Sequence, residues 1–279
     1  MYVLGDDTDD RRFPLSTERT FDCPICGDSV VTRDARKLYC NKKCADRARN
    51  RVQTRVEPAY QLVSQSPDLK GFSKLTTPEK QSILRGEAGH SIVMFDIEAT
   101  HLKPNVGRIL CCSFKPLGGE VYTFSGHDKR FKMRDVYDDS TMARAIIEEL
   151  EKYDIIVGWN SKNFDVKFIN SRAVRSPEGR SKRAQFHVDG MWSWRSKSNA
   201  WSGLNNVQRF ALPENEAEKT SIEWDKWMQA LGWNRALREA AMAEIIEHCE
   251  LDVIVLEDVY LRMVEADYVR SIRRDGGVL

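Results

Sequence analysis

The sequence predicts an α/β protein with a mixed β-sheet that is flanked by helices and preceded by a small cysteine-rich module. From residue 91, short apolar segments of strand length are followed by segments with helical periodicity, an order typical of one sheet covered by helices. Four of the seven cysteines cluster before residue 45. With 279 residues, the chain is long enough for one sizeable core and a small appendage.

The composition excludes some classes of protein. The chain has 43 Lys and Arg against 42 Asp and Glu, so overall charge does not by itself indicate nucleic-acid binding. It has no apolar run of ~18 residues, and its first ten residues are acidic without an apolar core, so we expect neither a membrane span nor a secretory signal. We therefore expect a cytoplasmic protein, of a prokaryotic cell or a virus-infected host cell, whose cysteines are not paired as disulfides.

The chain divides into four parts. Residues 1–20 are acidic and aperiodic, and we expect a disordered tail. Residues 21–55 hold the cysteine cluster and a basic helix, and residues 56–90 form a linker with one short helix capped by Thr76. Residues 91–279 form the α/β domain.

The elements of that domain follow from its periodicity. Apolar runs predict five strands, at residues 91–96, 109–114, 120–124, 155–157 and 186–188. The first three follow one another directly, so we expect an antiparallel meander, to which parallel strands are added. Helical periodicity predicts a helix after Ser140, a helix through Val166 and Ile169, and a helix over 237–264 with at most a break or bend.

Two acids close the first predicted strand. Asp96 and Glu98 are two residues apart, so on a strand both side chains point to the same face. Neighbouring carboxylates repel each other unless a cation lies between them. The pair therefore predicts a cation site, although an ordinary strand end with two solvated acids would show the same local pattern.

Two later motifs are less specific when each is taken alone. Asp165 follows a short apolar strand at the start of a predicted helix, where an acid also complements the helix dipole. His248 and Asp252 are four residues apart and therefore lie on one helix face, where a surface pair is the alternative.

Together, the three motifs resemble those of the DEDD superfamily of 3′–5′ exonucleases, which are DnaQ-like and have an RNase H-like fold. The resemblance covers about residues 91–265. Within the superfamily, this segment is similar in character to the YprB-type subgroup and to the proofreading domain of family B polymerases. The residues that match the motifs are Asp96, Glu98, Asn160, Phe164, Asp165 and Asp252. The chain departs from the family at His248, because the family has a Tyr four residues before the last acid or a His five residues before it.

The resemblance implies a two-metal-ion exonuclease. The four carboxylates would hold two Mg²⁺ or Mn²⁺ ions about 3.5–4 Å apart. His248 would orient or deprotonate the attacking water. The products would be nucleoside 5′-monophosphates, and single-stranded DNA is slightly favoured over RNA because of the likeness to proofreading domains.

Basic and aromatic residues are candidates for substrate binding. The candidates are Asn160, Lys162 and Phe164 in the second motif, Arg180, Lys182 and Arg183 in a basic loop, and Arg47, Arg49, Arg51 and Arg55 in the basic helix. A solvated loop is the alternative for the second set. Trp192, Trp194 and Trp201 either stack on bases or pack in the core. The segment with Trp224, Trp227 and Trp233 looks helical, and we expect these three in the core.

The cysteine cluster has the spacing C-x2-C-x13-C-x3-C, formed by Cys23, Cys26, Cys40 and Cys44. Four thiolates suit tetrahedral Zn²⁺, so we expect a structural, treble-clef-like zinc finger, with unpaired thiols as the alternative. Residues 33–55 carry nine basic side chains against two acidic ones, which favours phosphate contacts. Docking on the nuclease domain or on a partner protein is the alternative.

The leading hypothesis is thus an exonuclease whose zinc finger aids the binding of substrate or partner. The alternative is a catalytically inactive nucleic-acid-binding module, or an assembly module for replication or repair proteins. The three remaining cysteines, Cys111, Cys112 and Cys249, lie in apolar surroundings and are expected in the core.

Overall fold

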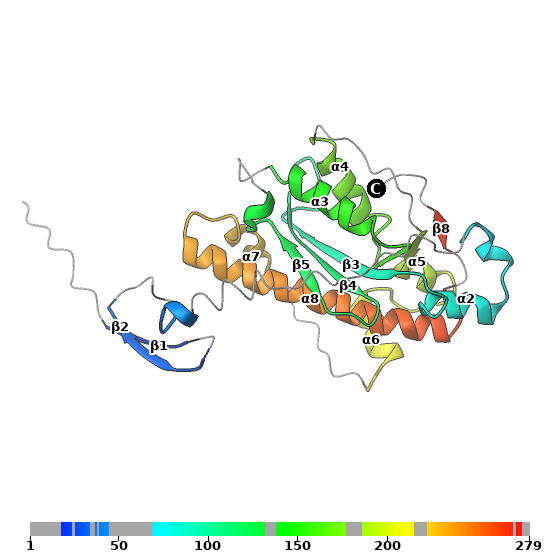
Figure 1. Ribbon diagram of the computed structural model, residues 1–279, viewed down its shortest axis with the longest axis horizontal. Helices are drawn as coiled ribbons and strands as arrows, with labels where there is room; N and C mark the ends of the chain where they lie inside the picture. The colour runs from blue at the N-terminus through cyan, green and yellow to red at the C-terminus, as the bar shows by residue number, and fades with distance from the viewer. Residues whose placement is uncertain are drawn as a thin grey trace, which may run out of the picture. The chain divides into compact units, whose positions relative to one another are not determined.

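The chain forms two compact units, one within residues 1–60 and one within residues 61–279 (Figure 1). The computed structural model describes residues 18–23, 26–33, 37, 39–44, 69–131, 138–176, 186–214, 222–269 and 272–274. The tail up to residue 17 and the seven basic candidates Arg47, Arg49, Arg51, Arg55, Arg180, Lys182 and Arg183 lie outside the described residues.

The smaller unit contains a two-stranded antiparallel ribbon. Its strands are β1 (Arg19–Asp22) and β2 (Ser29–Thr32). The connection is tight because Gly27 adopts a φ of 78° and its N–H donates to the Cys23 carbonyl at 2.8 Å. The positive φ explains why a glycine follows Cys26.

The larger unit has a six-stranded mixed sheet with the order β5-β4-β3-β6-β7-β8. Its strands are β3 (Ile92–Ala99), β4 (Ile109–Pro116), β5 (Tyr122–Ser125), β6 (Ile155–Gly158), β7 (Phe186–Asp189) and β8 (Arg273–Arg274). The first three form an antiparallel meander, and β6 and β7 pair in parallel on the other side of β3. The predicted mixed sheet is confirmed, and the short edge strand β8 is an addition to it.

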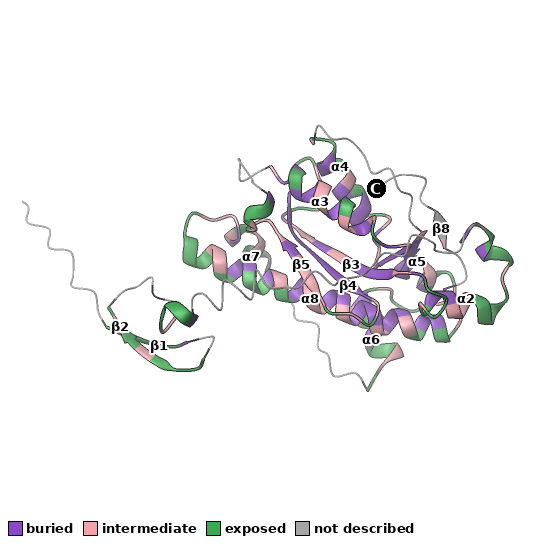
Figure 2. Cartoon of the chain, in the orientation of Figure 1, coloured by how far each residue is buried: buried purple, intermediate pink, exposed green. Residues whose placement is uncertain are grey.

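Helices cover both faces of this sheet, and for this reason its central strands are apolar on both sides (Figures 1 and 2). The α-helices are α2 (Thr77–Leu84), α3 (Ser140–Leu150), α4 (Asp165–Ala173), α5 (Gly190–Arg195), α6 (Leu204–Ala211), α7 (Trp224–Gln229) and α8 (Arg235–Glu265). Val93 and Phe95 of β3 belong to the core beneath α3 and α4, whereas Ile92 and Met94 belong to the core shared with α8. Two 3₁₀ helices, η1 (Leu69–Lys74) and η2 (Lys129–Phe131), also belong to this unit.

Helix α8 is a single helix of 31 residues, about 46 Å long. It begins after Asn234, whose side-chain oxygen accepts hydrogen bonds from the backbone N–H groups of Ala236 and Leu237. No break interrupts it, so a single rod extends beneath β3 and β4 and presents residues from several turns to them. The expected helix is confirmed, and it starts two residues earlier than predicted.

The short helix α2 packs on the C-terminal end of α8. Glu79 accepts a hydrogen bond from the Thr76 N–H at 2.7 Å, which completes the predicted cap. The Tyr260 hydroxyl donates to the Leu84 carbonyl at 2.7 Å, and the Gln81 amide donates to the Val264 carbonyl at 3.1 Å. The end of the predicted linker is thus attached to the larger unit. Among the described residues, no helix has the length and apolar character needed to cross a membrane.

Candidate active site and metal centres

Strand β3 brings the first pair of acids to the site. Asp96 and Glu98 lie opposite Ser113 and Cys111 of β4, and both are half-buried on the same face of the strand. The register with β4 shifts just after Glu98, one pair before the ladder ends at Ala99. The predicted same-face placement of the two acids is therefore present at the end of a central strand.

Helix α8 brings a histidine and an acid to Glu98. His248 and Asp252 lie one turn apart and are both buried. His248 Nε2 lies 3.6 Å from Glu98 Oε1, and one ligand atom from each of the three residues lies within 4.8 Å of the others. These three side chains form a cluster that could hold one metal ion.

Asp165 approaches from the first turn of α4. Its carboxylate accepts a hydrogen bond from the Ile97 N–H, between the two acids of β3, at 3.2 Å. Burial, together with the negative charges of Asp189 and Asp252, raises the pKa of Asp165 to about 7. A bound cation would reverse this effect, because it would favour the ionised carboxylate.

Asp96 is held toward α8 by a thiol. The Cys249 Sγ lies 3.7 Å from Asp96 Oδ2 and 3.4 Å from the Asp96 carbonyl oxygen. Burial raises the pKa of Cys249, so the thiol stays protonated and donates. Neither Asp96 nor Asp165 belongs to the 4.8 Å cluster, but Asp165 interacts electrostatically with Asp252 of that cluster.

Two residues of the site were not predicted from the sequence. The first is Trp227 on α7, whose indole N–H donates to Glu98 Oε2 at 3.0 Å. It is half-buried against the core that includes Ile245 and Cys249, as expected of a tryptophan, but no local pattern linked it to Glu98. Trp233, also expected in the core, is fully exposed, so that prediction was wrong.

The second is Asp189, at the end of β7. Its carboxylate accepts hydrogen bonds from the backbone N–H groups of Asn160 at 3.1 Å, Lys162 at 3.0 Å and Trp192 at 3.2 Å. It therefore caps α5 and also holds the loop that leads to Asp165. An aspartate at the start of a helix is typical of a cap, but no local pattern indicates this second contact.

The candidate substrate residues of the second motif have structural contacts. Asn160 has a φ of 60° and accepts a hydrogen bond from the Asn163 side chain. The Phe164 ring lies 5.6 Å from the Phe168 ring and packs against the core of α3 and α4. Lys162 is half-buried. Contact of these residues with nucleic acid stays a prediction.

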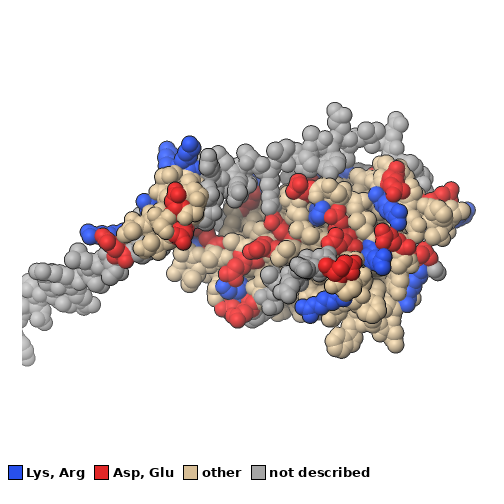
Figure 3. Space-filling model, turned by 90° about the horizontal axis from the view of Figure 1, so that it is seen from below, with Lys and Arg blue, Asp and Glu red and all other residues tan. Residues whose placement is uncertain are grey.

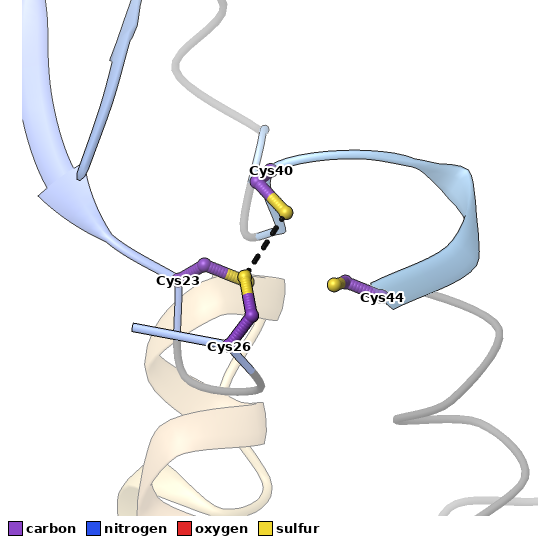
Figure 4. Close-up of side chains that lie close together, drawn as sticks. All are labelled: Cys23, Cys26, Cys40 and Cys44. Carbon is purple, nitrogen blue, oxygen red and sulfur yellow. Dashed lines mark hydrogen bonds between the residues drawn. The ribbon is translucent and has the colours of Figure 1, made fainter. Parts of the chain in front are cut away.

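The smaller unit brings the four predicted cysteines together. Cys23, Cys26, Cys40 and Cys44 have sulfur atoms within 4.8 Å of one another, and Cys26 and Cys40 lie 3.4 Å apart (Figure 4). All four are free thiols, as are the buried Cys111, Cys112 and Cys249. The four sulfurs point toward one another, an arrangement that suits a tetrahedral metal ion.

Comparisons with known proteins place the larger unit in a family. The model of the RNase H superfamily matches residues 93–264, and proteins of this superfamily are usually nucleases that use divalent metals. The chain is similar to the family B DNA polymerase from the hyperthermophilic archaeon Pyrobaculum calidifontis, with 17% identity and a TM-score of 0.43; the similarity covers 63% of this chain and 27% of the polymerase chain. A search of the curated proteins found no match. On the match over residues 93–264, which agrees with the mixed sheet and its flanking helices, the chain belongs to the RNase H superfamily.

Proposed function

We propose that the chain is a metal-dependent 3′–5′ exonuclease that hydrolyses phosphodiester bonds of nucleic acid. The observation that carries this proposal is the meeting of Glu98, His248 and Asp252 within 4.8 Å, in a chain of the RNase H superfamily. The raised pKa of Asp165 supports it, since buried acids without a compensating cation are costly. The 3′–5′ direction comes from the resemblance of the motifs to DEDD exonucleases.

The chemistry of the side chains fits two Mg²⁺ or Mn²⁺ ions. Asp96, Glu98, Asp165 and Asp252 would hold them through carboxylate oxygens, the ligands that these hard cations prefer. Such ions activate water and stabilise the leaving oxygen in phosphodiester hydrolysis. The chain's own contribution is to fix the acids from three directions, β3, α4 and α8, and to bury two of them, Asp165 and Asp252.

The substrate we propose is a nucleic acid with a free 3′ end, with single-stranded DNA preferred slightly to RNA and nucleoside 5′-monophosphates as products. On the face drawn in Figure 3, described Lys and Arg side chains are interspersed with Asp and Glu. Among the described residues drawn there, this face shows no channel of uniform positive charge. We propose that the basic residues near the finger, which holds one structural Zn²⁺ at its four cysteines, aid binding of substrate or of replication and repair proteins.

The test is degradation of 3′-labelled single-stranded DNA, duplex DNA and RNA in parallel, with Mg²⁺ or Mn²⁺. We expect metal-dependent release of labelled mononucleotide from a single strand. Asp96→Asn should abolish release, whereas the control Asp225→Asn, on the exposed face of α7, should not. Binding without any metal-dependent degradation would contradict the enzyme and support an inactive nucleic-acid-binding or assembly module.

A further inference from the structure

His248 differs from the other buried groups of the site because it presents a nitrogen to the acids. The 3.6 Å between His248 Nε2 and Glu98 Oε1 is longer than a good hydrogen bond, which spans about 2.7–3.2 Å. Two neighbouring ligands on one ion lie about 3 Å apart for bonds of about 2.1 Å, so the two atoms need to approach by only a few tenths of an ångström to bind the same ion. Asp252 completes the triangle, with all three ligand atoms within 4.8 Å.

The position of His248 on α8 explains this arrangement. Four residues along a helix are about one turn, so His248 and Asp252 project side by side from α8 toward the end of β3. A general base must face the water that it deprotonates. A ring nitrogen of His248 instead lies within 4.8 Å of carboxylate oxygens of Glu98 and Asp252, two of the residues that the proposed function assigns to metal binding.

Trp227 controls which oxygen of Glu98 faces the histidine. The indole N–H of Trp227 holds Glu98 Oε2 at 3.0 Å, and the other oxygen, Oε1, is the one nearest to His248. A hydrogen bond of this kind fixes the orientation of a metal ligand. Trp227 is therefore a positioning residue for the cluster.

We infer that Glu98, His248 and Asp252 bind one divalent ion through a mixed oxygen and nitrogen donor set, with Trp227 positioning Glu98. Imidazole suits first-row transition ions better than Mg²⁺, which prefers oxygen ligands, so this set favours Mn²⁺ over Mg²⁺. The inference rests on the proposed function, and it replaces the water-activating role that the resemblance implies for His248.

The experiment measures Mn²⁺ binding to the full zinc-loaded chain by electron paramagnetic resonance. Pulsed measurements detect the nitrogen of a directly bound imidazole as a ¹⁴N modulation. The variant is His248→Gln, and the matched control is His101→Gln, an exposed histidine in the loop after β3. We expect the ¹⁴N signal in the unaltered chain and in the control, and its loss in His248→Gln.

Affinity provides a second readout. We expect His248→Gln to weaken Mn²⁺ binding by roughly tenfold or more and Mg²⁺ binding, measured by competition, by a smaller factor. Trp227→Phe keeps an aromatic ring and the imidazole but removes the hydrogen bond to Glu98. It should weaken Mn²⁺ binding roughly 10–100-fold while the ¹⁴N signal persists.

Two other results would overturn the inference, and they differ in what else they contradict. If His248→Gln binds Mn²⁺ as tightly as the unaltered chain while catalysis slows, His248 acts on water and is not a ligand. If the unaltered chain binds no Mn²⁺, or binds it in a way that Glu98→Gln does not weaken, the metal site of the proposed function is contradicted as well.

Discussion

Asp165 links the electrostatics of the site to the stability of the fold. Its pKa is raised from 3.8 to about 7 by burial and by neighbouring acids, so between these values the folded chain holds a proton that the unfolded chain has lost. The resulting contribution to stability is fully present below about pH 4 and is lost as the pH rises through about 7. Without added divalent ions, we therefore expect the free energy of unfolding to fall from about pH 5 to about pH 8.

Asp165→Asn isolates this contribution, because an amide of the same shape does not titrate. Urea unfolding at the two pH values should show a smaller fall in the variant than in the unaltered chain. Added Mn²⁺ should stabilise the unaltered chain more at the higher pH, where Asp165 is ionised. An identical pH dependence in both chains would mean that Asp165 does not carry this charge effect.

The placement of single residues could be predicted where the local sequence period determines the direction of their side chains. A period of two gave Asp96 and Glu98 a common face of β3, and a spacing of four gave His248 and Asp252 a common face of α8. The contact of Trp227 with Glu98 joins residues 129 positions apart, so no local pattern contains it.

At the scale of elements, the five strands and three helices predicted for residues 91–279 are present, because each has a strong apolar pattern. The short helices α5 and α6 were not predicted. Helices of six to eight residues are marginal alone and depend on tertiary packing, which a local sequence window does not show. Yet α5 and α7 lie at the site, where they contact Asp189 and Glu98.

The loop between β6 and α4 provides the prediction at this scale. Asp189 satisfies the backbone N–H groups of Asn160, Lys162 and Trp192, so Asp189→Ala leaves these donors without that acceptor. We expect a loss of at least about 2 kcal/mol in the free energy of unfolding, measured by chemical denaturation. Because this loop leads to Asp165, nuclease activity should fall as well.

Asp189→Asn is the matched comparison, since it keeps one carbonyl oxygen as acceptor and should lose less stability than the alanine variant. Asp225→Ala, at an exposed position of α7, controls for loss of an acid. A stability of Asp189→Ala equal to that of Asp225→Ala would show that the loop does not depend on this carboxylate.

In the whole molecule, the site exists because β3 is central in the sheet. It pairs with β4 on one side and with β6 on the other, and it is covered by α4 on one face and α8 on the other. The meander of β3, β4 and β5 follows from their direct succession, but the placement of β6 and β7 on the other side of β3 depends on contacts between distant segments. The acids, spread over more than 150 residues, therefore meet through topology and not through local spacing.

The division into two units leads to the last prediction, which concerns the cysteines. The smaller unit is too short to bury a large apolar core, so a metal ion at Cys23, Cys26, Cys40 and Cys44 would supply most of its stability. Replacing Cys40 and Cys44 by Ser in the full chain should remove about one zinc ion per molecule, as elemental analysis would measure.

The double variant should leave the thermal unfolding of the larger unit unchanged, because that unit has its own core. It should weaken nucleic-acid binding and flatten its dependence on salt, since phosphate contacts from an ordered basic finger release counterions. Replacing the exposed Lys42 and Lys43 by Ser separates charge from metal: zinc should remain while the salt dependence still decreases. If the cysteine variant keeps its zinc, the metal centre is contradicted. If it loses zinc but binds nucleic acid as before, the finger would instead bind a protein partner.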